Sequence, residues 1–136
     1  MASGTTQCTR SGRDANRCIC SPVGPYTNGQ SGEGAAFLYL GSAGGLSAVA
    51  AWSAESDQAS ASFGSSVASA GDVNGDGYDD VVVGAHRYDN GQFGEGAVFL
   101  YLGSAAGLSA TPAWTAEADR GGAWLGSTVA SAGDVN

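Results

Sequence analysis

The sequence predicts an all-β fold made of four-stranded antiparallel sheets that stack face to face. Three observations predict it: a long internal repeat, short apolar segments between turn-forming residues, and no apolar spacing of the helical type. The composition agrees, because 23 of the 136 residues are glycine. Such a chain turns often and favours short strands over long helices.

The internal repeat covers most of the chain. Residues 26–74 align with residues 88–136 at a constant offset of 62 residues, without an insertion. Of the 49 aligned positions, 35 are identical, which indicates duplication of one structural unit. The repeating unit is therefore 62 residues long, and the chain holds about two of them.

One period contains four segments with the pattern of short strands, separated by turns rich in Gly, Asn and Ser. Two of the four are apolar at consecutive positions, so we expect both of their faces to be buried between neighbouring sheets. The expected strands are Val67–Ala70, Asp80–Ala85, Ala97–Leu102 and Ala113–Glu117.

A repeat of four antiparallel strands is typical of a β-propeller blade, which stacks on neighbouring blades around a central axis. Residues 26–136 are expected to hold a partial blade, one complete blade at about 63–117, and the start of a further blade. Propellers have about four to eight blades. Two repeats cannot close such a ring, so we expect an incomplete ring that needs further blades or self-association.

Residues 1–25 differ in composition from the repeats, because they hold all three cysteines and three of the five arginines. We interpret them as an atypical N-terminal segment, either a degraded blade or a disordered stretch. Cys18 and Cys20 are too close along the chain to bond easily with each other. A disulfide from Cys8 to one of them would leave the other free.

The charge balance excludes two classes of partner. The net charge is −8, from 13 acidic residues against 5 arginines. A surface of this sign repels nucleic-acid phosphates and anionic lipids, so we expect no nucleic-acid binding.

The sequence has no long apolar segment. No run of 18 apolar residues is present, so we expect no membrane insertion. The N-terminus also lacks the apolar core of a secretory signal peptide.

Residues 72–80 have the pattern of a calcium-binding loop. Oxygen-bearing side chains fall at loop positions 1, 3, 5 and 9, position 7 offers a backbone carbonyl, and Gly75 and Gly77 allow the chain to curl around an ion. The alternative is an acidic hairpin turn without a metal. The candidate Ca²⁺ ligands are Asp72, Asn74, Asp76, Tyr78 through its carbonyl, and Asp80, and the second copy retains a partial site in Asp134 and Asn136.

A helical calcium motif is the nearest rival to this interpretation. An EF-hand loop shares the spacing of the first ligands but ends with an acidic residue at position 12 and is followed by a helix. Here position 12 is Val83, and it lies in the β-branched run 81–83. These residues favour a strand, so we exclude the EF-hand.

The repeat resembles the FG-GAP repeat family. Phe63-Gly64 supplies the Phe-Gly pair, residues 72–80 supply the calcium loop, and Gly84-Ala85-His86 stands where the family has Gly-Ala-Pro. In the second copy Leu125-Gly126 replaces Phe-Gly. The resemblance implies seven-bladed propellers with calcium loops on one rim, as in integrin α heads and many bacterial secreted or surface proteins, which usually serve adhesion or ligand recognition.

We therefore expect a calcium-binding, extracellular or cell-surface module for adhesion or for binding a protein or carbohydrate ligand. The alternative is a non-catalytic propeller segment of a larger secreted hydrolase. We do not expect an enzyme, because His86 is the only histidine and no serine or cysteine lies in a recognisable nucleophile motif.

Glutamates that recur at the repeat offset, and three tryptophans, could also be taken for ligand-binding residues. The pairs Glu33 with Glu95 and Glu55 with Glu117 suggest the paired carboxylates of glycosidases, but recurrence in each repeat favours a structural role, since one active site needs one such pair. We expect the tryptophans to pack between blades rather than to form a sugar-binding platform. They are Trp52, Trp114 and Trp124.

Overall fold

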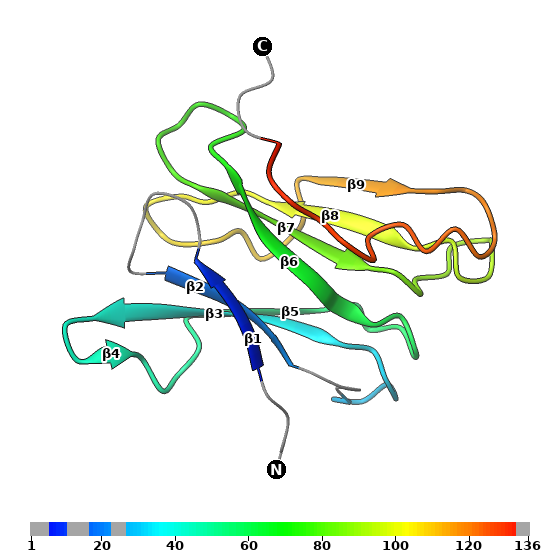
Figure 1. The fold of residues 1–136 in the computed structure, drawn as a ribbon, viewed down its shortest axis with the longest axis horizontal. Helices are drawn as coiled ribbons and strands as arrows, with labels where there is room; N and C mark the ends of the chain where they lie inside the picture. The colour runs from blue at the N-terminus through cyan, green and yellow to red at the C-terminus, as the bar shows by residue number, and fades with distance from the viewer. Residues whose placement is uncertain (1–5, 11–16, 23–26, 133–136) are drawn as a thin grey trace.

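The computed structural model describes residues 6–10, 17–22 and 27–132. Those residues form strands and no helix, and none of them forms a helix that could span a membrane. The strands lie in two antiparallel sheets (Figure 1). The first sheet contains β1 (Thr6–Arg10), β2 (Arg17–Pro22), β3 (Ala35–Ser42), β4 (Gly45–Leu46) and β5 (Trp52–Glu55), and the second contains β6 (Phe63–Gly71), β7 (Asp80–Ala85), β8 (Ala97–Tyr101) and β9 (Trp114–Glu117).

The second sheet confirms the predicted blade of four antiparallel strands. Its order is β6-β7-β8-β9, so each strand pairs with the next along the chain. The first strand begins at Phe63, four residues earlier than predicted, because its pairing with β7 continues past an irregularity between Phe63 and Ser66. Gly64 lies there with a φ of 80°, and such a break hides the strand pattern from the sequence.

The first sheet has the same plan. β1, β2 and β3 pair in chain order, β5 pairs with the other edge of β3, and β4 is a short addition to the end of β3. The described parts of the N-terminal segment therefore supply two strands of this sheet. In the β1–β2 ladder the Cα of Cys8 lies opposite that of Cys20. Cys20 is disulfide-bonded and Cys18 is a free thiol.

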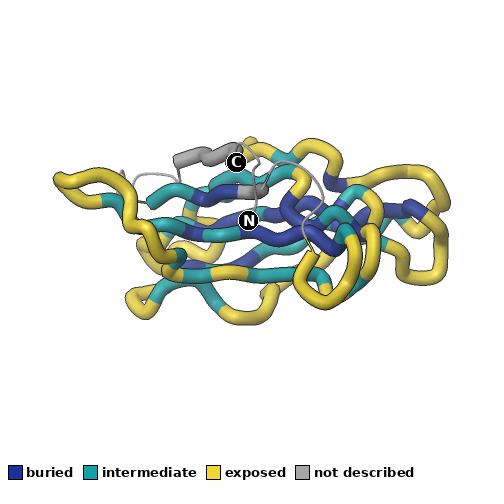
Figure 2. The backbone as a smooth tube through the Cα atoms, turned by 90° about the horizontal axis from the view of Figure 1, so that it is seen from below, coloured by how far each residue is buried: buried dark blue, intermediate teal, exposed yellow. Residues whose placement is uncertain are grey.

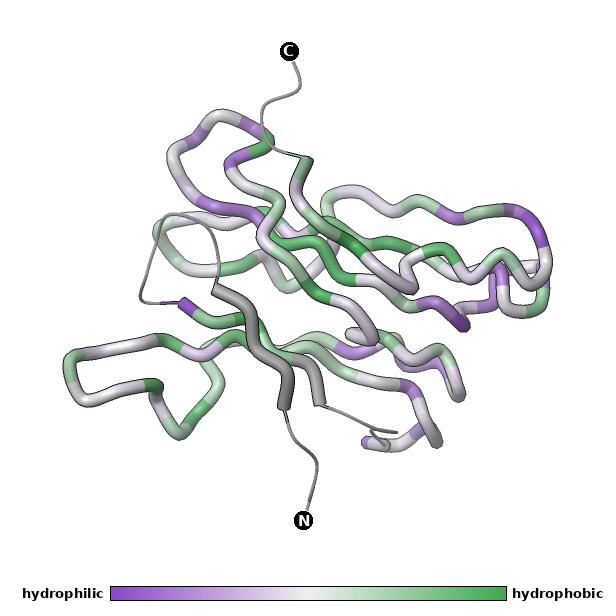
Figure 3. Tube along the Cα trace, in the orientation of Figure 1, coloured by the Kyte–Doolittle hydropathy of each residue, from purple (hydrophilic) through white to green (hydrophobic). Residues whose placement is uncertain are grey.

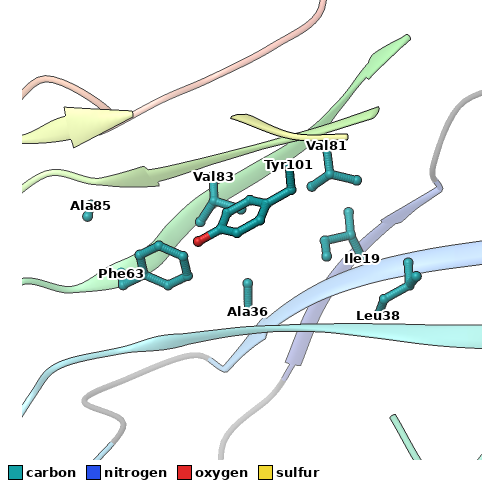
Figure 4. Packing of buried hydrophobic residues seen from close by; sticks show 8 residues of the cluster. All are labelled: Ile19, Ala36, Leu38, Phe63, Val81, Val83, Ala85 and Tyr101. Atoms are coloured by element: carbon teal, nitrogen blue, oxygen red, sulfur yellow. The ribbon is translucent and has the colours of Figure 1, made fainter. Parts of the chain in front are cut away.

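The two sheets pack face to face, with a small apolar core between them. Figure 4 shows the Tyr101 ring reaching from the second sheet toward the first. The buried backbone lies in the middle of the molecule and the exposed loops lie around it (Figure 2). The core consists of Ile19, Ala36 and Leu38 from the first sheet and Phe63, Val81, Val83, Ala85 and Tyr101 from the second.

The outer face of the second sheet is less buried than predicted. Residues 98 and 100 of β8 are half-buried, whereas Ala97 and Tyr101 on the inner face are buried. The expectation that both faces of β8 are buried is therefore wrong for the described residues. The reason is that only the inner face has a sheet packed against it.

The tryptophans differ in their environments. Trp52 packs between the sheets as predicted, with its ring edge-on to Tyr101 at a centroid distance of 4.9 Å. The prediction is wrong for Trp114, which is 54% exposed. Trp114 is the repeat counterpart of Trp52, but within the described chain no third sheet lies beside it. Trp124 is 55% exposed and lies edge-on to the ring of His86, which follows β7.

A backbone joint connects each sheet with the segment that follows it. Gly34 forms a parallel bridge with Phe63, and Gly96 forms the same bridge with Leu125 one repeat later. A Cβ on Gly34 would lie 2.1 Å from the Phe63 carbonyl oxygen, so only glycine permits this approach. The Phe-Gly pair at residues 63–64 is therefore part of the joint between blades.

Candidate metal centre

The predicted calcium loop connects β6 to β7 at one end of the second sheet, at the top of Figure 1. Polar residues concentrate in it, while β7, which follows it, is largely apolar (Figure 3). Gly75 and Gly77 have φ values of 76° and 88°, a conformation that side chains other than glycine rarely adopt. The loop curls as the sequence predicted.

The Asp72 carboxylate lies at the centre of the loop and accepts three backbone amides. Its Oδ1 accepts from Gly75 at 2.8 Å and from Asp76 at 3.0 Å, and its Oδ2 accepts from Gly77 at 2.7 Å. Hydrogen bonds from the Gly77 amide, and then from the Asp76 and Gly75 amides, lower the pKa of the exposed Asp72 carboxyl, and slight desolvation opposes them. Asp72 is therefore ionised and held in place at neutral pH.

Asn74 and Asp76 lie beside each other in the same turn. The Asn74 side-chain amide donates to Asp76 Oδ2 at 3.1 Å, and Asp76 Oδ1 accepts the backbone amide of Tyr78 at 2.9 Å. The local hydrogen bonds of a short Asx-rich loop thus fix the backbone from residue 74 to residue 78. Both side chains remain exposed.

Asp80 is placed differently, because it is fully buried at the start of β7. Its Oδ2 accepts the Val73 amide at 2.8 Å, and its Oδ1 accepts the Gly103 amide at 2.8 Å. Asp80 therefore ties the calcium loop to the β8–β9 connection. Each carboxylate oxygen has a second lone pair, so these bonds leave acceptor capacity.

The residues of the loop fit a hard cation in chemistry. They offer carboxylate and amide oxygens, which Ca²⁺ prefers, and Asp72 is oriented and ionised by three amides. Among the described residues, groups of three acidic side chains come within 4.8 Å of one another at two places, and neither place includes Asp72, Asp76 or Asp80. Asp134 and Asn136 lie outside the described residues.

The two convergent acidic groups lie at the other end of the sheets. They come together because strand pairing sets Glu55 opposite Ala35, and Glu117 opposite Ala97, beside the glutamate that precedes each strand. The recurrence of the glutamates was visible in the sequence, but their convergence required the strand pairing. The groups are Glu33, Glu55 and Asp57 in the first sheet, and Glu95, Glu117 and Asp119 in the second.

His86 is placed just after β7, as part of a turn. Its Nδ1 lies 2.9 Å from the Ser65 hydroxyl, a pair that the sequence did not reveal. Burial, and secondly the positive charge of Arg87, lower the pKa of His86. The Ser65 hydroxyl also donates to the Gly84 carbonyl at 3.4 Å, and the other described contact of the ring is with Trp124, so the pair links strands of one blade.

Comparison with known proteins agrees with this architecture. Residues 63–101 match the FG-GAP repeat family, so the segment from β6 through β8 is an FG-GAP repeat, a unit that forms β-propeller blades. The chain is also similar to integrin alpha-PS5 of Drosophila melanogaster, with 50% identity over 52 residues, and to integrin alpha-IIb of Mus musculus, with 46% identity over 50 residues. These alignments cover 38% and 37% of this chain and 5% of each relative.

Proposed function

We propose that this chain is part of a calcium-binding β-propeller that acts as an extracellular or cell-surface module for adhesion or ligand binding, and not as an enzyme. The observation that carries the proposal is the Asp72 carboxylate, oriented by three backbone amides inside an FG-GAP repeat. The similarity to integrin alpha chains supports the adhesion part of the proposal.

The ion would be held in the loop by the oxygens of residues 72–80. Asp72, Asn74 and Asp76 supply exposed side-chain oxygens, and the Tyr78 carbonyl and the remaining lone pairs of Asp80 complete the set. When bound, the ion would offset the negative charge of this acidic loop and stiffen the β6–β7 connection. It serves structure rather than chemistry.

The ligand would be recognised by the loops at the ends of the blades, which are the exposed parts of the chain (Figure 2). A protein or carbohydrate partner suits this surface, because propellers present loops from several blades together on one rim. Blades stack through apolar faces, so the module also needs further blades or copies of itself to cover the exposed Trp114.

Titration of the chain with Ca²⁺ in a calorimeter tests the proposal. We expect binding in the range of roughly 10⁻⁴–10⁻³ M that is typical of extracellular modules. Asp76→Ala should remove the binding event of the loop, whereas Asp89→Asn, which changes an acidic residue outside the loop, should retain it. A titration of Asp76→Ala that matches that of the unmodified chain would refute the loop as a calcium site.

A further inference from the structure

Each of the two sheets carries a convergent group of acidic side chains, and both groups are separate from the calcium loop of residues 72–80. In each group, one oxygen from each of three carboxylates lies within 4.8 Å of the others. The two groups are related by the repeat offset of 62 residues, so the arrangement is present twice. In the second sheet, strand register places the group at the end opposite the calcium loop. Glu117 pairs with Ala97 at the start of β8, whereas Asp80 begins β7 beside the last residues of β8.

The buried member of each group has an unpaired oxygen. Glu33 and Glu95 are both 0% exposed. The Oε1 of Glu33 accepts the Asn28 amide at 2.6 Å, and that of Glu95 accepts the Asn90 amide. The Oε2 atom of each has no hydrogen-bond partner. A buried, unpaired carboxylate oxygen is costly, so the site calls for a positively charged partner.

The two other carboxylates of each group add to the need for a positively charged partner. Glu55 and Glu117 are half-buried, and Asp57 and Asp119 are exposed. Water therefore screens part of their charge, but three carboxylates at this separation still repel one another. Asparagine side chains hold the second carboxylate in position: Asn28 donates to Glu55 at 2.9 Å, and Asn90 donates to Glu117 at 2.7 Å. These neutral donors orient the carboxylates but leave their charge uncompensated.

The two groups do not share an arginine at the same repeat position that would neutralise their negative charge. In the second group Arg120 follows Asp119 directly, but its counterpart in the first group is Gln58. The shared features are three carboxylates and an asparagine, which suit a hard divalent cation. Ca²⁺ binds oxygen ligands at about 2.3–2.6 Å, so two ligands of one ion lie up to about 5 Å apart, as the oxygens in each group do.

The position of the groups gives such an ion a structural task. The carbonyl oxygen of Glu33 accepts the Phe63 amide at 2.8 Å, and that of Glu95 accepts the Leu125 amide at 3.0 Å. Each buried glutamate therefore belongs to the joint with the next blade. An ion bound to its side chain would fix this joint to the end of β5 in the first blade and of β9 in the second.

We propose that each blade binds a divalent cation, Ca²⁺ by its oxygen chemistry, at this joint. The ligands are Glu33, Glu55 and Asp57 in the first blade, and Glu95, Glu117 and Asp119 in the second. With the ion of the calcium loop, the chain binds three ions. Loss of the joint ions loosens the contact between blades and leaves the loop site in place.

The experiment separates the joint sites from the calcium loop. Asp72→Asn combined with Asp76→Asn gives a chain without the loop site, and calorimetry should count two Ca²⁺ bound to it. Adding Glu33→Gln and Glu95→Gln, which keep the side-chain shape, should abolish that binding. Adding Asp89→Asn instead removes a nearby charge outside the groups and should leave two ions bound.

Three outcomes would overturn the proposal. The first is that the chain with Asp72→Asn and Asp76→Asn folds but binds no Ca²⁺ at millimolar concentration. The second is unchanged binding after the glutamine substitutions. The third is a rise in melting temperature on glutamine substitution that is equal with and without Ca²⁺, which indicates a shared proton instead.

A second variant applies if the quadruple variant does not fold. Glu117→Gln, added to Asp72→Asn and Asp76→Asn, should lower the number of bound Ca²⁺ ions from two to one. If the loop substitutions remove no ion, the loop proposal fails while the joint sites stand.

Discussion

Trp52 reaches from the first blade to the second, where its indole Nε1 donates a hydrogen bond to the carbonyl oxygen of Ser109 at 2.9 Å. The same ring lies edge-on to Tyr101. One side chain thus contributes both a directional bond and apolar contact to the packing of adjacent blades.

Replacement of Trp52 should therefore weaken the chain. Trp52→Phe removes the hydrogen bond and part of the ring, and we expect a loss of about 1–3 kcal/mol in the free energy of unfolding. Trp114→Phe is the matched control at the same position of the next repeat, and its exposed ring should make the loss less than about 0.5 kcal/mol. Chemical denaturation of both variants measures the difference, and equal losses would contradict the inter-blade role of Trp52.

The joint between blades predicts that two glycine-to-alanine substitutions differ in their effect on stability. Gly34→Ala should disrupt the joint, because the added Cβ meets the Phe63 carbonyl at 2.1 Å and the φ of 82° is itself unfavourable. Gly29→Ala meets nothing within 4 Å and pays only for its positive φ, about 1–2 kcal/mol. Comparison of the two midpoints in urea tests this, and a Gly34→Ala variant as stable as Gly29→Ala would rule out the close approach.

Tyr101 should make the fold sensitive to alkali. Burial raises its pKa from 10.0 to about 12, so in the folded chain the phenol keeps its proton where the unfolded chain loses it. Stability is then complete below pH 10 and falls as the pH rises from 10 to about 12. Tyr101→Phe should reduce this fall, whereas Tyr78→Phe in the exposed loop should not. Urea denaturation across this range measures it, and an identical fall in Tyr101→Phe would contradict the assignment.

The sequence predicted the local features well, because they depend on short-range chemistry. The strands β7 and β9 lie within a residue of their predicted bounds, and the curled loop with Gly75 and Gly77 follows from its own residues. The match of residues 63–101 to the FG-GAP repeat agrees with the resemblance carried by Phe63-Gly64 and the loop.

The remaining features depend on contacts distant in the sequence. The approach of Gly34 to Phe63 joins two blades, and nothing in the local pattern indicates it. The glutamates at 33 and 55 recur visibly, but only the β3–β5 register brings them together with Asp57. The exposure of Trp114 likewise follows from which sheets lie beside it, and its residue type predicted burial.

The effect of calcium on thermal unfolding tests the central claim most directly. Ca²⁺ that binds only the folded chain adds about 2.7 kcal/mol to its stability at one hundred times the Kd. The melting temperature should therefore be higher in Ca²⁺ than in chelator, with a much smaller rise in Mg²⁺, which prefers a smaller, water-rich shell, and Asp76→Asn should reduce the calcium-dependent rise. Equal melting temperatures in Ca²⁺ and in chelator would contradict the account and leave residues 72–80 as an acidic turn.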